Sequence, residues 1–90
     1  MVVRYYSVKD ILAGSFMNPV AMPNDNVAKR SLAISGKDVN NGQFKDNWRD
    51  IQLWYLFSLD TDTGLIIENI PYLIGNLAEY VEVDPNEYKN

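Results

Sequence analysis

The sequence contains neither cysteine nor histidine. Without cysteine there can be no disulfide bonds, so packing alone must stabilise a fold of 90 residues. A catalytic cysteine and a nucleophile activated by histidine are both excluded. The serine and aspartate residues form no recognisable nucleophile motif. No carboxylate lies in an apolar stretch that would shift its pKa towards neutrality. We therefore predict that the protein is not an enzyme and uses no cofactor.

Long hydrophobic runs are absent as well. No apolar run approaches the roughly 18 to 20 residues of a membrane-spanning helix, and the first ten residues lack the pattern of a signal peptide. We expect a cytoplasmic protein without a membrane partner. The hydrophobic content of 47%, with eleven aromatic residues, is typical of a folded domain. The sequence predicts one α+β domain over residues 1–84 and a frayed acidic C-terminal tail at 85–90.

The first third of the chain combines a strand with an irregular segment. Residues 2–8, VVRYYSV, are β-branched and aromatic, which favours a strand. Residues 11–23 contain Gly14, Pro19 and Pro23 at spacings that a helix interior does not tolerate. We expect this second segment to lie extended across the body of the domain.

One main helix is predicted at about 25–35. Asn24 or Asp25 can cap its first turn, and the helix is expected to stop near Gly36. Helical periodicity leaves a set of mostly charged residues on the open side. The predicted core-facing residues are Val27, Ala28, Ser31, Leu32 and either Ile34 or Ser35, and the open-side residues are Lys29, Arg30, Ala33 and Lys37.

A β-hairpin is predicted from 51–59 and 65–70, joined by the turn DTDTG with Gly64 at positive φ. It belongs to a small antiparallel sheet of three to four strands. Residues 71–83 fit either a strand or a helical turn, because Pro71 interrupts the pattern and periodicity does not decide between them. Strict alternation predicts one face of 51–59 to be Ile51, Leu53, Tyr55, Phe57 and Leu59.

The strand at 51–59 is apolar on both faces, but a single helix can cover only one of them. We therefore predict a homo-oligomer, most simply a dimer, that buries the second face. The expected interface residues are Trp54, Leu56, Tyr72, Leu73 and Leu77. The alternative is that residues 11–23 and 70–81 fold back over this face within one chain.

The DTDTG turn also has the alternating acids of a calcium loop. Gly64 arrives at the fifth position instead of the sixth, and no flanking helices are predicted. Local hydrogen bonds in a hairpin loop explain Asp60, Asp62 and the threonines, so we predict no metal site.

Charge is divided unevenly along the chain, although the net charge is −4. Residues 1–49 carry seven cations and four acids, whereas residues 50–90 carry one cation and eight acids. In the first half aromatic rings alternate with cations, a composition that suits single-stranded nucleic acid. The candidate nucleic-acid-binding residues are Arg4, Tyr6, Lys9, Lys29, Arg30, Lys37, Lys45, Trp48 and Arg49.

Three motifs, in the same order and spacing, make the chain resemble the small non-structural protein of gokushovirus-like microviruses, which are phages with single-stranded DNA. The resemblance covers about residues 4–77. The matching positions are Tyr6, Val8 and Asp10; Phe16 and Pro19; Pro23, Asn24, Asp25, Ala28 and Arg30; and Leu53, Leu56, Asp60, Thr63 and Gly64. Phe57 and Leu59 depart from the family pattern, which puts the hairpin's packing in doubt.

The resemblance implies a phage accessory protein in the host bacterial cytoplasm that binds single-stranded DNA during genome replication or packaging. Arg30 matches a family position, and it is either a functional cation or a structural one paired with Asp10 or Asp60. Two other functions stay open. The chain could dock on a phage replication or capsid protein, or its acidic half could inhibit a host enzyme, in both cases without contacting DNA.

Overall fold

The computed structural model describes residues 1–82, so the predicted tail at 85–90 lies outside the described residues. The described chain forms six strands, one α-helix and three 3₁₀ turns. In chain order these are β1 (Val2–Asp10), β2 (Ser15–Phe16), β3 (Val20–Met22), α1 (Asp25–Lys37), η1 (Val39–Asn41), η2 (Trp48–Asp50), β4 (Ile51–Asp60), β5 (Ile66–Glu68), β6 (Tyr72–Asn76) and η3 (Leu77–Tyr80).

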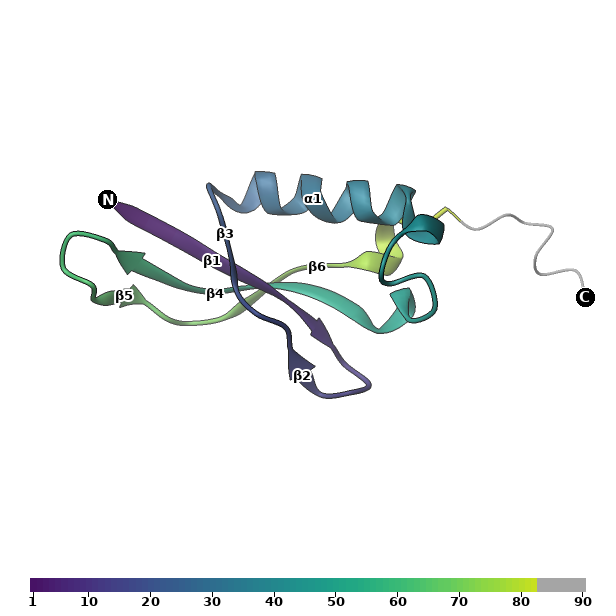
Figure 1. Ribbon diagram of the computed structural model, residues 1–90, viewed down its shortest axis with the longest axis horizontal. Helices are drawn as coiled ribbons and strands as arrows, with labels where there is room; N and C mark the ends of the chain where they lie inside the picture. The colour runs from purple at the N-terminus through teal and green to yellow at the C-terminus, as the bar shows by residue number, and fades with distance from the viewer. Residues whose placement is uncertain (83–90) are drawn as a thin grey trace, which may run out of the picture.

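The six strands form one antiparallel sheet with β1 and β4 at its centre. β2 and β3 pair with the free edge of β1, while β5 and β6 pair with the other edge of β4. Figure 1 shows α1 lying along one side of this sheet. We call this side the inner face and the opposite side the outer face. The α+β class and the hairpin are confirmed, although the sheet has more strands than predicted.

The additional strands come from residues 11–23, which were expected to cross the body of the domain. They instead turn back at Gly14, where φ is +73°, and extend the sheet beside β1. A carboxylate oxygen of Asp10 accepts hydrogen bonds from the backbone N–H groups of Leu12 and Ala13, which stabilises this turn. Sequence reasoning recognised the breakers but not the partner that the extended segment would find.

The core lies between α1 and the inner face. Tyr6 of β1 and Ile51, Leu53 and Tyr55 of β4 are buried there against Ala28 and further residues. The side chains of β4 alternate between the two faces only as far as Tyr55. Tyr55 pairs with Tyr6 and Phe57 with Tyr5, so Leu56 is an extra residue without a partner on β1, which is a β-bulge. The predicted placement of Phe57 and Leu59 on the same face as Tyr55 is therefore wrong. Ser58 is buried instead, and Phe57 stacks on Tyr5 at the outer face.

The helix begins as predicted but ends later. The Asn24 side chain accepts a hydrogen bond from the N–H of Val27 at 2.9 Å and so caps the first turn. Gly36 does not end the helix, because α1 continues to Lys37. The buried stripe of α1 consists of Ala28, Leu32 and Gly36, while Ile34 is 61% exposed.

Glycine is required at position 36 because α1 packs closely against Tyr80 there, and not because the helix ends there. A Cβ atom at this position would lie 2.5 Å from the Cβ of Tyr80 and 2.7 Å from its carbonyl carbon.

Residues 72–80 form β6 followed by η3, in which Asn76 and Glu79 make a capping box. This resolves the open choice at 71–83 as far as Tyr80: a strand followed by a helical turn. None of the described helices is long and apolar enough to cross a membrane.

We predict that Gly36→Ala destabilises the fold by about 1–2 kcal/mol. Overpacking against backbone costs about 1–3 kcal/mol or more, which outweighs the roughly 1 kcal/mol by which alanine is favoured over glycine in a helix. The matched control is Gly42→Ala, whose added Cβ would lie 3.7 Å from its nearest neighbour, an ordinary contact. Urea unfolding measures both, and equal stability of the two variants would contradict the close approach of α1 and η3.

Candidate nucleic-acid interface

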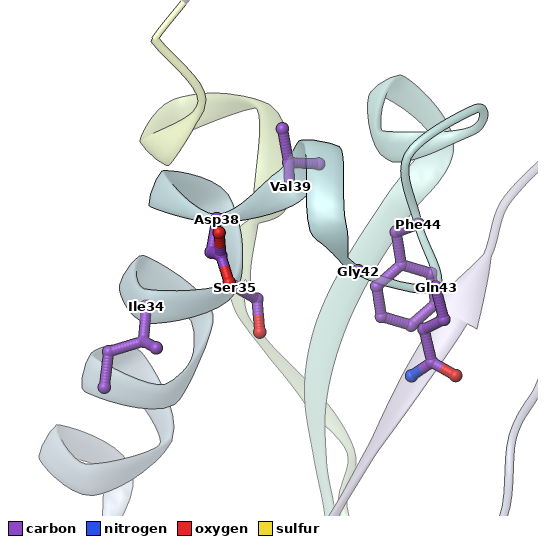
Figure 2. Close-up of a pocket in the computed structure, with 7 residues that line it drawn as sticks. All are labelled: Ile34, Ser35, Asp38, Val39, Gly42, Gln43 and Phe44. Atoms are coloured by element: carbon purple, nitrogen blue, oxygen red, sulfur yellow. The ribbon is translucent and has the colours of Figure 1, made fainter.

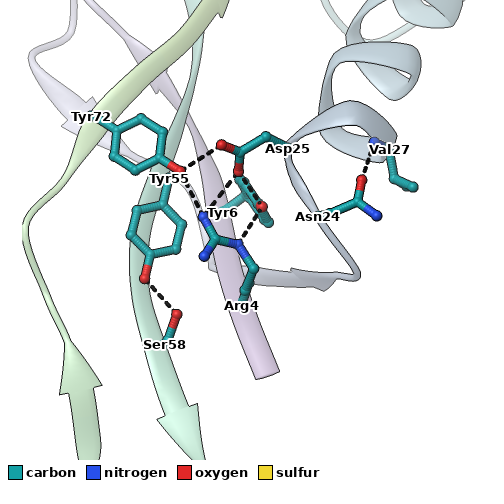
Figure 3. Close-up of polar contacts among 8 residues, drawn as sticks. All are labelled: Arg4, Tyr6, Asn24, Asp25, Val27, Tyr55, Ser58 and Tyr72. Carbon is teal, nitrogen blue, oxygen red and sulfur yellow. Dashed lines mark hydrogen bonds and ion pairs between the residues drawn. The ribbon is translucent and has the colours of Figure 1, made fainter. Parts of the chain in front are cut away.

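A polar cluster joins the first residue of α1 to the sheet (Figure 3). The hydroxyl groups of Tyr6 and Tyr72 each donate to the carboxylate of Asp25, both at 2.6 Å. The guanidinium of Arg4 donates to the same carboxylate at 3.0 Å and to the Tyr72 hydroxyl oxygen at 2.6 Å. Arg4 also lies over the ring of Tyr55, 4.2 Å from its centroid. The cluster thus ties together α1, β1, β4 and β6.

These contacts change the acidity of the groups that form them. Burial alone would raise the pKa of Asp25, but hydrogen bonds from Tyr6, Tyr72 and Arg4, together with the positive charge of Arg4, lower it below its ordinary value. Burial and the hydrogen bond to Asp25 raise the pKa of Tyr72 to about 12. At neutral pH the cluster therefore holds an ionised carboxylate, an arginine cation and two protonated phenols.

Two residues expected to contact nucleic acid are used in this cluster. Tyr6 is completely buried, so its ring cannot stack on a base in this fold, contrary to the expectation from sequence. Arg4 is paired with Asp25, and its positive charge is largely neutralised there. Sequence reasoning missed this role because Asp25 and Tyr72 lie 21 and 68 residues from Arg4.

A pocket of about 280 Å³ opens between the C-terminal end of α1 and the following loop. Figure 2 shows Ile34, Ser35 and Asp38 on one side of this pocket, with Gln43 and the ring of Phe44 on the other. The half-buried Phe44 packs against the core, which fixes one wall. Asp38 accepts a hydrogen bond from Asn41 within the loop at 2.7 Å. The lining therefore combines one aromatic ring with amide, hydroxyl and carboxylate groups.

Exposed cations adjoin the pocket on both of its sides. Arg30 precedes Ile34 by one helical turn and so lies on the same side of α1, and Lys37 follows one turn later. Lys45 follows Phe44 directly, on the loop side. All three cations are exposed, and none forms a salt bridge with a residue in the described part of the chain.

The structural alternative for Arg30 is a pair with Asp10 or Asp60. Neither pair forms within residues 1–82. Asp10 instead holds the turn after β1 and accepts from the amide of Asn47 at 3.4 Å, while Asp60 accepts from the N–H of Asp62 at 2.9 Å. Both acids thus shape local turns.

The remaining candidate cations do not join the pocket. The periodicity of α1 puts Lys29 on the flank opposite Ser31 and Ser35. Lys9 lies on the outer face, with its ammonium group over the rings of Phe16 and Trp54. Arg49 stacks on Trp48, 4.1 Å from the ring centroid. The nine predicted residues therefore divide among five places instead of forming one patch.

The residues predicted for the oligomer interface also lie in different parts of the structure. Trp54 and Leu73 face each other across β4 and β6 on the outer face, and Leu56 is the extra residue of the bulge. Tyr72 belongs to the inner face, where its ring packs on Tyr55. Leu77 is completely buried in the core of one chain, so it cannot contact a second copy without unfolding.

Residues 1–82 contain no group of three or more histidine, cysteine, aspartate or glutamate side chains that could hold a metal ion. In the DTDTG turn, Gly64 has φ +77° and the N–H of Asp60 donates to the carbonyl of Leu65. Asp62 pairs instead with the N-terminal ammonium group at 2.8 Å. The acids of this turn thus have structural partners.

Comparison with known proteins relates the chain to a phage family. A family model described as Phage ORF5 protein matches residues 3–80, which span both β1 and the last turn, η3. No curated protein and no solved structure matches the chain.

We predict that Asp25→Asn destabilises the fold by about 1–2 kcal/mol at neutral pH. The loss is smaller than for a fully buried charge network, because the carboxylate of Asp25 is partly exposed. Since the pKa of Asp25 is lowered from 3.8 in the folded chain, its contribution is complete above that pH and is lost as the pH falls through the folded-state value. The Tm difference between the two proteins should therefore shrink in acid. Asp46→Asn, at an exposed loop position, is the control. A Tm difference that stays constant down to pH 2 would contradict an ionic role for Asp25.

Proposed function

We propose that this chain, which belongs to the Phage ORF5 protein family, is a phage accessory protein that binds single-stranded DNA through α1 and the adjoining pocket. The observation that carries the proposal is the pocket between α1 and the 42–44 loop, with its aromatic wall. Three exposed cations stand close in sequence to the residues that line it. The resemblance to microvirus non-structural proteins supports the same role in the host cytoplasm during replication or packaging.

The pocket suits a nucleobase better than a phosphate. Its lining contains the carboxylate of Asp38, which would repel an anion but can accept a hydrogen bond from the amino group of a base. The side-chain amide of Gln43 can both donate and accept at a base edge. The ring of Phe44 offers a stacking surface, a contribution of about 1–3 kcal/mol per base in proteins that bind single strands.

The cations around the pocket suit the backbone of the strand. Arg30 and Lys37 come from α1 and Lys45 from the loop, so a chain whose base enters the pocket can pass phosphates to either side. Bases in a duplex are stacked and cannot enter such a pocket without being unpaired. We therefore propose a preference for single strands. The net charge of −4 keeps binding weak and sensitive to salt.

We predict that Arg30→Glu with Lys45→Glu weakens binding of a fluorescein-labelled single strand, measured by anisotropy at several salt concentrations. The slope of log K against log salt should also fall by about 0.7 for every phosphate that the variant no longer neutralises. The charge-matched control is Lys29→Glu with Arg49→Glu, which also reverses two exposed cations but at positions away from the pocket, and it should change both quantities much less.

Equal effects of the variant and the control would show only a general charge effect and would contradict a located site. Binding of the unmodified protein that does not respond to salt would also contradict the proposal. If no single strand binds at any salt concentration, docking on a phage replication or capsid protein replaces DNA binding as the best function.

A further inference from the structure

The outer face of the sheet carries a continuous set of large apolar side chains. Tyr5 of β1 and Phe57 of β4 are paired and stacked, with ring centroids 4.8 Å apart. Phe16 of β2 packs edge-on against Trp54 of β4, with centroids 6.1 Å apart. Cross-strand pairing then places Leu73 beside Trp54. Aromatic and aliphatic groups therefore extend across β2, β1, β4 and β6.

This face has no covering layer in the described part of the chain. A sheet that is apolar on both faces needs a layer on each of them, and α1 supplies only one. Residues 11–23 do not fold back over the outer face, as the intramolecular alternative requires. They pair edge-on with β1, and at the outer face they contribute the ring of Phe16 against Trp54 and the carbonyl of Met17, which accepts from the buried Ser7 hydroxyl. Phe16 and Leu73 are 41% and 42% exposed.

The face is large enough to form a substantial part of a dimer interface. The 26 residues of β1, β2, β4 and β6, at about 3.3 Å per residue along a strand and about 4.8 Å between strands, cover a sheet area of roughly 400 Å² before side-chain relief is added. Side chains increase the accessible area towards the roughly 800 Å² that each partner contributes to a standard interface. An apolar patch of this extent is among the largest that a soluble monomer exposes, and such patches often mark a site of interaction.

The charges on the outer face select the kind of partner. Lys9 is the charged side chain that the pairing register of β1, β4 and β6 places there, and its ammonium group already lies over Phe16 and Trp54. One cation is too little for a polyanion, and the register places no acid there that would attract a basic partner. The partner must be apolar, nearly neutral and flat, which is a description of the same face on a second copy.

We propose that two copies of this chain pack outer face against outer face around a two-fold axis. The assembly has four layers, helix, sheet, sheet and helix, with the two sheets about 10 Å apart as in other sheet-on-sheet packings. The interface residues are Tyr5, Phe16, Trp54, Phe57 and Leu73. This interface retains Trp54 and Leu73 from the sequence prediction, whereas Leu56, Tyr72 and Leu77 do not belong to it. It leaves both copies of α1 outside, so it does not depend on the proposed DNA binding.

Light scattering on a size-exclusion column tests the proposal with the full chain. We expect the unmodified protein at micromolar concentration to have twice the 10.3 kDa mass of one chain. Leu73→Lys should weaken the dimer more than about 100-fold, because it buries a second cation beside Lys9 on a face where the register places no acid. The control Ile34→Lys introduces the same charge at a more exposed site on α1 and should leave the dimer intact. A mass of one chain for the unmodified protein would overturn the proposal, as would a dimer that survives Leu73→Lys.

Tryptophan fluorescence locates the interface by a second readout, which needs no charged substitution within it. In the Trp48→Phe variant Trp54 is the one remaining tryptophan, and its emission should shift to longer wavelength as the dimer dissociates on dilution. In the Trp54→Phe variant the emission comes from Trp48, away from the outer face, and should not shift. A dilution-dependent shift of Trp48 alone would place the interface elsewhere and overturn the proposal.

Discussion

The carboxylate of Asp25 accepts hydrogen bonds from three side chains, Arg4, Tyr6 and Tyr72, which come from two different strands. The position of α1 depends on this cluster, because the helix buries only a narrow stripe of small and aliphatic residues against the sheet. The other end of α1 is fixed where Gly36 meets Tyr80. A polar contact at the start of the helix and a steric contact near its end together set its orientation on the sheet. Apolar packing along so narrow a stripe would not fix that orientation alone.

This arrangement separates the cations by role. The pair between Arg4 and Asp25 is structural, whereas Arg30, Lys37 and Lys45 are exposed beside a pocket whose wall is Phe44. Fixing the end of α1 also fixes that pocket, since η1 continues directly from the helix and buries Val39. The inner face is thus used for folding, the exposed side of α1 for the proposed contact with DNA, and the outer face for the proposed contact with a second copy.

Sequence reasoning succeeded where the determining contacts are local. The Asn24 cap, the Gly64 turn and the exposure of Arg30 all depend on residues within one or two turns of each other. It failed where a distant partner decides the outcome. The bulge at Leu56 reverses the faces of Phe57 and Ser58, and the burial of Tyr6 depends on Asp25 and Tyr55, none of which periodicity can show. The pocket could not be predicted because two segments must meet to form it.

The most direct test of the proposed function is an NMR titration of the ¹⁵N-labelled full chain with a short single strand. Because α1 is held on the sheet by Asp25 and its exposed side is free, the amide shifts should concentrate at residues 30–45, with little change along β1 and β4. Shifts concentrated on the outer-face residues Tyr5, Trp54 and Phe57 would contradict this division of the surface, and so would shifts spread evenly over the chain.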